Sequence, residues 1–185
     1  AISSSLFSNL KFGNHVIFQN DLYGGTRNFI KKQFPKYGIE FSFSEGLEPS
    51  DFERELKPNT VGIYIETPSN PLFKIIDLKK LSQLAKDNKC WTIVDNTFAS
   101  PINQNPINFG IDMVVHSATK YLGGHSDISA GAVVSNNFFI DKIYDHAKNF
   151  GGNLSEFSTW LLERSIKTVF LRVEAQNKNA MDLAK

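Results

Sequence analysis

Short apolar segments alternate with amphipathic ones along the whole chain. Five segments are short, mostly apolar and rich in β-branched or aromatic residues, as buried strands are: His15–Gln19, Val61–Ile65, Trp91–Val94, Met113–Val115 and Ala132–Val134. A sixth, Ile39–Phe43, alternates apolar and polar residues and also predicts a strand. Between these segments, apolar residues recur at helical spacing, and capping residues, glycines and prolines mark the ends. The helices predicted in this way are the end of one at Ala1–Leu10, then Arg27–Phe34, Asp51–Lys57, one capped by Asp77 and running to Lys89, Asn137–Asn149, Phe157–Thr168 and one from Leu171 onward.

Strands that alternate with helices predict an α/β fold, in which helices cover a mostly parallel sheet. In such sheets, ligands bind beyond the carboxyl ends of the strands. Three of these ends lead into polar loops, namely those that follow Ile65, Val94 and Val115. We therefore expect the functional residues to lie in these loops.

Composition and charge narrow the class of protein. A chain of 185 residues forms one domain, or one domain with a fragment of another. Its 20 basic and 19 acidic residues are interspersed and leave a net charge of +1, so no nucleic-acid-binding surface is expected. No apolar run approaches the roughly 18 to 20 residues that a membrane span needs, so no membrane partner is expected.

The single cysteine and the histidines limit the possible disulfides and metal sites. Cys90 is the only cysteine, which excludes an internal disulfide and favours a reducing, cytoplasmic location. The 4 histidines do not have the spacing of metal ligands, and no metal site is predicted. The chain opens without Met and closes on a helical pattern that has no stop signal, so we expect a piece of a longer protein.

The loop after Val115 carries the most informative chemistry. Ser117, Thr119 and Lys120 follow a buried strand directly. Hydroxyls can donate to phosphate oxygens, and a lysine amine can form a Schiff base with an aldehyde once its pKa is lowered. A phosphorylated aldehyde cofactor needs this combination. An isolated Ser-x-Thr-Lys, however, is more often a polar turn with a surface lysine.

Asp95 changes that balance. It ends the apolar strand Trp91–Val94, where an unpaired charge is costly. Taken alone, it could equally be a helix N-cap or a turn aspartate. Its functional interpretation is a partner for a protonated pyridine nitrogen, which it would keep protonated so that the ring accepts electrons. Because Asp95 and Lys120 follow two strand ends, one ring could bridge them.

Three segments, taken in order, closely resemble the Cys/Met-metabolism family of pyridoxal-phosphate enzymes: Glu66–Pro71, Val94–Pro101 and His116–Ser126. The string Ser-Ala-Thr-Lys-Tyr-Leu-Gly-Gly-His-Ser-Asp is highly specific, and the match is colinear from about Ala1 to Lys185. The resemblance implies pyridoxal 5′-phosphate as cofactor. It also implies the fold-type I architecture of the aspartate aminotransferase-like large domain, a three-layer α/β/α sandwich with a mostly parallel, mixed sheet.

The resemblance assigns a role to each residue of the lysine and aspartate motifs. Lys120 is similar to the lysine that holds the cofactor as a Schiff base and afterwards moves protons on the substrate. Asp95 matches the residue that holds the pyridinium. Ser117 and Thr119 match the residues that bind the phosphate.

Two more site residues follow from the resemblance. Tyr23 matches the tyrosine that stacks on the cofactor ring and acts as acid or base on the leaving group. Asn70 matches the asparagine near the ring oxygen of the cofactor. Without the other motifs, Tyr23 would be a buried aromatic and Asn70 a turn residue. The segment Asp21–Thr26 is predicted to be a loop, because paired glycines supply turns with positive φ.

The implied activity is trans-sulfuration, a γ- or β-elimination or replacement on a sulfur amino acid. Tyr23–Arg27 is most similar to the cystathionine γ-synthase and cystathionine γ-lyase branch, and Gly25 stands where methionine γ-lyases have a cysteine. Methionine γ-lyase, cystathionine β-lyase and O-acylhomoserine sulfhydrylase are the alternatives within the family. Outside enzymes, a pyridoxal-phosphate-binding module without turnover is the alternative. A nucleotide-binding domain would need a Gly-x-Gly-x-x-Gly that this chain does not contain.

The resemblance also predicts how the chain is organised. It places a domain boundary near Leu171, so that residues 1–171 form the cofactor-binding large domain and residues 172–185 begin a C-terminal domain. It implies a small-molecule amino-acid substrate and a homodimer or homotetramer whose active sites lie at subunit interfaces. Further contacts are expected outside this sequence: phosphate-binding amides before Ala1, a Tyr and an Arg from the neighbouring subunit, and a carboxylate-binding arginine after Lys185.

Overall fold

The computed structural model describes residues 1–185 and contains one six-stranded sheet with the strand order β2-β1-β3-β4-β5-β6. The strands are β1 (His15–Gln19), β2 (Glu40–Ser44), β3 (Thr60–Glu66), β4 (Trp91–Asp95), β5 (Met113–Ser117) and β6 (Gly131–Ser135). Strands β1 to β5 are parallel to their neighbours, and β6 is antiparallel to β5. All six predicted strands are present within two residues at either end, and the predicted mixed, mostly parallel sheet is confirmed.

Most helices also lie where the sequence predicts them. They are α1 (Ile2–Phe7), α2 (Gly24–Gln33), α3 (Pro49–Glu53), α4 (Leu78–Asp87), α5 (Ser100–Asn103), α6 (Asn137–Phe150), α7 (Glu156–Ile166), α8 (Val169–Leu183) and the short 3-10 helices η1 (Phe34–Tyr37) and η2 (Pro106–Phe109). Asp77 caps α4 as predicted, because its side chain accepts a hydrogen bond from the Lys80 N–H at 3.0 Å. Helix α3 ends earlier than predicted, since the Lys57 N–H donates to the Thr60 hydroxyl instead of continuing the helix.

The prediction that paired glycines form a positive-φ turn before α2 was wrong. Gly24 and Gly25 are the first residues of the helix, and neither has a positive φ. Gly25 instead lets the Tyr23 ring lie close to the helix: a Cβ on Gly25 would lie 2.6 Å from Cε1 of this ring, so a larger residue would require the ring to move. The Arg27 N–H donates to the Tyr23 carbonyl at 3.1 Å, which closes the first turn earlier than predicted.

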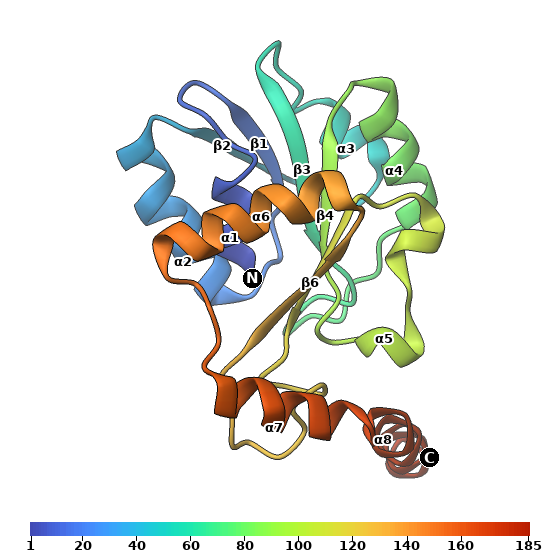
Figure 1. Cartoon of the computed structure of the whole chain (residues 1–185). Helices are drawn as coiled ribbons and strands as arrows, with labels where there is room; N and C mark the ends of the chain where they lie inside the picture. Colours follow the sequence, from blue (N-terminus) through green and yellow to red (C-terminus); the bar gives the residue numbers. More distant parts are fainter.

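Helices cover the two faces of the sheet (Figure 1), as the alternation of side chains along the strands requires. On one face, Phe18, Tyr64 and Ile93 pack in a core of 13 buried residues with α1, α2 and α6. On the other, Ile63 and Val94 belong to a core of 12 buried residues formed with α3 and α4. This is the predicted three-layer α/β/α sandwich.

Helices α7 and α8 lie together beyond the end of the sheet where the parallel strands finish (Figure 1). Val169 and Val173 of α8 pack against Ala118 and Leu122, which lie on either side of Lys120 in the sequence. The Arg172 guanidinium donates to the carbonyls that follow Lys120, at 2.7 Å from Tyr121 and 3.4 Å from Leu122. These contacts hold the loop after β5 against the start of α8.

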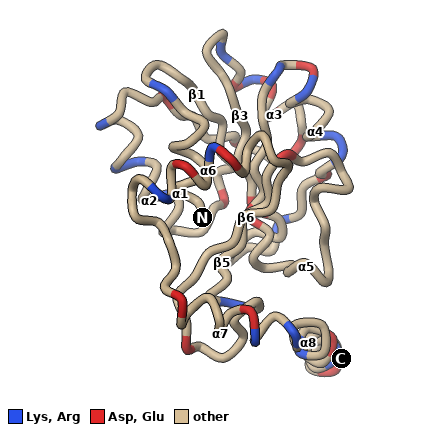
Figure 2. The backbone as a smooth tube through the Cα atoms, viewed as in Figure 1, with Lys and Arg blue, Asp and Glu red and all other residues tan.

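Lys/Arg and Asp/Glu residues are interspersed over the helices and loops (Figure 2). The ion pairs join side chains near the surface, as Lys57 and Glu40 do at 3.0 Å. No helix in the structure is both long and apolar enough to cross a membrane.

Candidate active site

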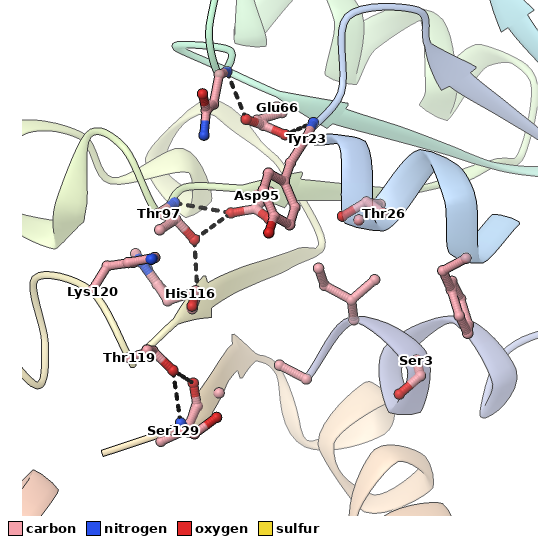
Figure 3. A pocket seen from close by; sticks show the side chains of 18 of the residues that line it. Ser3, Tyr23, Thr26, Glu66, Asp95, Thr97, His116, Thr119, Lys120 and Ser129 are labelled. Carbon is pink, nitrogen blue, oxygen red and sulfur yellow. Dashed lines mark hydrogen bonds between the residues drawn. The ribbon is translucent and has the colours of Figure 1, made fainter. Parts of the chain in front are cut away.

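One cavity of about 750 Å³ brings together all six residues that the sequence selects. It opens where the parallel strands finish, and Figure 3 shows several of its side chains pointing inward. The selected residues that line it are Tyr23, Asn70, Asp95, Ser117, Thr119 and Lys120. The strand order places β1 between β2 and β3, so the chain leaves β1 toward one side and β3 toward the other. Such a switch point is where doubly wound sheets bind ligands.

Asp95 lies at the base of this cavity with 6% of its surface exposed. Its Oδ1 accepts hydrogen bonds from the Thr97 N–H at 3.0 Å and the Thr97 hydroxyl at 2.5 Å, and its Oδ2 accepts a longer one from the Tyr64 hydroxyl at 3.4 Å. Burial raises the pKa of Asp95, and the bonds from Thr97 and Tyr64 oppose that rise. No lysine, arginine or histidine forms an ion pair with it. A cationic hydrogen-bond donor bound in the cavity would therefore stabilise the buried carboxylate of Asp95.

Thr97 joins the aspartate to the lysine motif, a role that sequence reasoning missed. Its hydroxyl donates to Asp95 and accepts from the Ser117 N–H at 2.8 Å. The end of β4 is thereby fixed relative to the end of β5. The available signal was the position of Thr97 two residues after a strand-ending aspartate, where Asx-type turns place a donor.

The loop after β5 carries the amine and the hydroxyls. Lys120 is exposed, and its side chain makes no ion pair. The Ser117 side chain forms no hydrogen bond within the protein, whereas the Thr119 hydroxyl accepts from the Ala130 N–H at 2.9 Å and donates to the Ala130 carbonyl at 3.2 Å. Thr119 thus pins the loop to the chain before β6, and Ser117 has the freer hydroxyl.

Tyr23 and Asn70 enter the cavity from the loops after β1 and β3. The Tyr23 side chain is 56% exposed and extends over the cavity (Figure 3). Both residues are bound through their backbone to the same side chain, because their N–H groups donate to Glu66 at 2.8 Å each.

Glu66 is a second buried acid of the site that sequence reasoning missed. Burial raises its pKa to about 7, although the N–H groups of Tyr23 and Asn70 lower it and the charge of Asp95 raises it further. The available signal was an acid at the last position of a buried strand, at the head of the segment Glu66–Pro71. Of the histidines, His116 also lines the cavity, and burial lowers its pKa to about 4, so it is neutral at pH 7.

The side chains around the cavity fit pyridoxal 5′-phosphate. A buried carboxylate without a cation suits a protonated ring nitrogen, and the free Ser117 hydroxyl suits a phosphate. An exposed lysine amine suits an aldehyde, and a tyrosine ring over the cavity suits stacking on the cofactor ring. All four features line the same cavity.

Comparison with known proteins points the same way. The family model of the Cys/Met metabolism PLP-dependent enzymes matches residues 1–185. The chain is 41% identical over 186 residues to the "Probable cystathionine gamma-synthase" of Herpetosiphon aurantiacus, covering 98% of this chain and 57% of that protein. It is 44% identical over 181 residues to a cystathionine β-lyase of Lactococcus lactis subsp. cremoris, covering 97% of this chain and 47% of that protein.

A solved structure shows the same fold. The crystal structure of a cystathionine γ-lyase from Lactobacillus plantarum, complexed with L-serine, superposes with a TM-score of 0.88 at 39% identity and covers 91% of this chain and 45% of that chain. The present chain thus spans about half the length of the curated relatives that it matches.

Proposed function

This chain belongs to the family of Cys/Met metabolism PLP-dependent enzymes, and from that membership we propose that its parent enzyme catalyses trans-sulfuration on a sulfur amino acid by γ- or β-elimination or replacement. Pyridoxal 5′-phosphate is the cofactor of the family. The observation that carries the proposal is the single cavity in which a buried, unpaired Asp95 lies with an unpaired Lys120 amine. When bound, pyridoxal phosphate supplies an electron sink for the carbanion that forms at the substrate Cα.

In this proposal, Asp95 holds the proton on the ring nitrogen. Its burial makes an unpaired charge costly, so a cationic partner stabilises the carboxylate and is itself kept protonated by it. Thr97 and Tyr64 orient the carboxylate through the hydrogen bonds to its two oxygens. Oxygen Oδ2 has only the longer bond and is the one we assign to the ring nitrogen.

Lys120 would hold the aldehyde group of the cofactor through Nζ. When not so engaged, its amine would take the proton from the substrate Cα and move protons at Cβ. Ser117 and Thr119 bind the phosphate and thereby fix the cofactor relative to this amine. The Ser117 hydroxyl, which has no partner in the protein, is the stronger of the two candidates.

Tyr23 would pack its ring on the cofactor and would donate its phenolic proton to the departing sulfur or oxygen. Asn70 would contact the ring oxygen of the cofactor. The exposed position of the Tyr23 ring over the cavity suits contact with a bound substrate. Each of these roles requires the loops after β1 and β3 to hold their places.

For the reaction itself, we propose the cystathionine γ-synthase or γ-lyase type, which the segment Tyr23–Arg27 favours. Cystathionine β-lyase is the second candidate, because a relative of that name is 44% identical. Incubation of the holoenzyme with cystathionine separates them. Cleavage at Cγ gives cysteine, 2-oxobutanoate and ammonia, whereas cleavage at Cβ gives homocysteine, pyruvate and ammonia. Formation of cystathionine from an O-acylhomoserine and cysteine identifies a synthase.

A cofactor that binds at Lys120 without any turnover of these substrates would contradict the enzyme proposal and favour a binding module. We further propose that residues 1–171 form the cofactor-binding domain and that a C-terminal domain begins with residues 172–185. A homodimer or homotetramer with shared active sites, in the cytoplasm, completes the proposal. Size-exclusion chromatography with light scattering tests the assembly.

A further inference from the structure

Glu66 connects two loops that leave the sheet in different directions. Its Oε2 accepts the Tyr23 N–H and its Oε1 accepts the Asn70 N–H, both at 2.8 Å. Tyr23 follows β1 and Asn70 follows β3, so the two bonds cross the switch point of the sheet. Each oxygen of one carboxylate thus fastens one loop of the cavity.

The carboxylate is itself fixed by its surroundings. Glu66 is 5% exposed and is the last residue of β3. Its own N–H donates to the Gln19 side chain at 2.9 Å, and the Gln19 amide donates in turn to the Asp21 carbonyl at 3.4 Å. A buried polar side chain with satisfied bonds in a low-dielectric setting is held more tightly than a surface one.

A second contact joins the same two loops at the surface. Lys74, beyond Asn70, pairs with Asp21, before Tyr23, at 2.5 Å. Their side chains are 43% and 23% exposed, so solvent and salt screen this ion pair. The buried contact through Glu66 is therefore the one expected to set the separation of the loops.

We propose that Glu66 is a positioning residue: its two carboxylate oxygens hold the loops of Tyr23 and Asn70 at the separation that the cofactor ring requires. The inference rests on the proposed function, since it takes Tyr23 and Asn70 as cofactor contacts. Glu66 acts through their backbone amides, because both of its carboxylate oxygens are occupied by these two N–H groups. Each N–H here donates to its own oxygen. The ionised side chain, which predominates above its pKa of about 7, supplies both acceptors, whereas an amide supplies one acceptor oxygen and an NH₂ group.

Glu66→Gln tests this requirement with nearly unchanged shape. The amide offers one acceptor oxygen, and its NH₂ group faces the remaining N–H donor, so one loop is released. In cofactor-free protein, we expect the amide hydrogen of Tyr23 or Asn70 to exchange at least about tenfold faster than in wild type. In the loaded enzyme, we expect an altered visible circular dichroism band and an increase of about tenfold in the dissociation constant for pyridoxal phosphate.

Asp112→Asn is the matched control. The Asp112 carboxylate also accepts a backbone N–H and a hydroxyl, both from Thr92, but it lies at the opposite end of the sheet. Its replacement is expected to lower stability without changing the exchange of the Tyr23 and Asn70 amides or the circular dichroism of bound cofactor. Lys74→Gln is expected to change the exchange rates of these amides and the dissociation constant for pyridoxal phosphate less than twofold.

The outcomes separate this inference from the proposed function. If wild type binds the cofactor at Lys120 and Glu66→Gln matches it in amide exchange, affinity and circular dichroism, the role of Glu66 is overturned. If wild type takes up no cofactor at Lys120, the proposed function fails, and positioning by Glu66 fails with it. If Glu66→Gln does not fold, hydrogen exchange in the wild type provides the test. Exchange of the Tyr23 and Asn70 amides as fast as that of loop amides without hydrogen bonds would overturn the positioning role of Glu66.

Discussion

Glu66 and Asp95 occupy paired positions in the β3–β4 ladder, at the carboxyl ends of two adjacent parallel strands. Partners in such a ladder point to the same face of the sheet, so the two acids share one environment. Burial raises the pKa of both, and the charge of Asp95 raises that of Glu66 further. They differ in their partners: Glu66 receives two backbone N–H groups, whereas Asp95 has one oxygen with a single long bond. Glu66 is accordingly assigned to structure and Asp95 to the cofactor.

The raised pKa of Glu66 makes stability depend on pH. The pKa is about 7 in the folded chain against an ordinary value of 4.5, so the folded state holds a proton that the unfolded state has lost between these values. Its stabilising contribution is complete below about pH 4.5 and is lost as the pH rises through about 7. The loss is at most roughly 3 to 4 kcal/mol, since one pKa unit corresponds to about 1.4 kcal/mol.

Urea unfolding of cofactor-free protein at several pH values measures this effect. Between pH 5 and 8, the free energy of unfolding of wild type should fall more steeply than that of Glu66→Gln. Equal slopes for the two proteins would show that Glu66 does not titrate in this range.

Asp95→Asn removes the charge that keeps the ring nitrogen protonated. We expect turnover to fall by at least about a hundredfold, because the ring then stabilises the carbanion poorly. Cofactor content should stay close to that of wild type, since the phosphate contacts are untouched. Steady-state kinetics and absorbance of the bound cofactor measure the two quantities. Near-normal turnover in Asp95→Asn would make Asp95 a structural residue of the Asx turn with Thr97.

Ser117→Ala removes the hydroxyl that has no partner within the protein. A hydrogen bond to a charged phosphate contributes about 1.5–3 kcal/mol, so the dissociation constant for pyridoxal phosphate should rise by roughly tenfold or more. Ser135→Ala is the control, because Ser135 bonds to the Asp112 carbonyl at the far end of the sheet. Equilibrium dialysis of the two variants compares them. Equal affinities would place the phosphate elsewhere in the cavity.

Much of the fold could be predicted from the sequence, because the spacing of apolar residues follows from which positions of a strand or helix are buried. The strand Trp91–Asp95 and the cap at Asp77 depend only on neighbouring residues, and both are where the pattern places them. The start of α2 was misjudged because Gly25 is not in a positive-φ turn. It lies in the helix, close to the ring of Tyr23.

Some residues of the candidate site could be predicted from the sequence and others could not. Lys120 and Asp95 could be selected from the sequence, since each stands in a distinctive motif. Glu66 and Thr97 were missed because their roles depend on partners in other loops: Glu66 bonds a residue 43 positions away, and Thr97 one that is 20 positions away. Sequence spacing contains no record of such contacts, which arise only when β1, β3, β4 and β5 lie side by side.

The most direct test of the account is the identity of the lysine that binds the cofactor. Holoenzyme reduced with borohydride should be digested and its peptides examined by mass spectrometry. We expect the pyridoxyl-phosphate mass on the peptide that contains Lys120, and a colourless protein without that mass for Lys120→Ala. A label on any other lysine of the wild type, or a yellow Lys120→Ala protein that still carries the label, would contradict the assignment of Lys120.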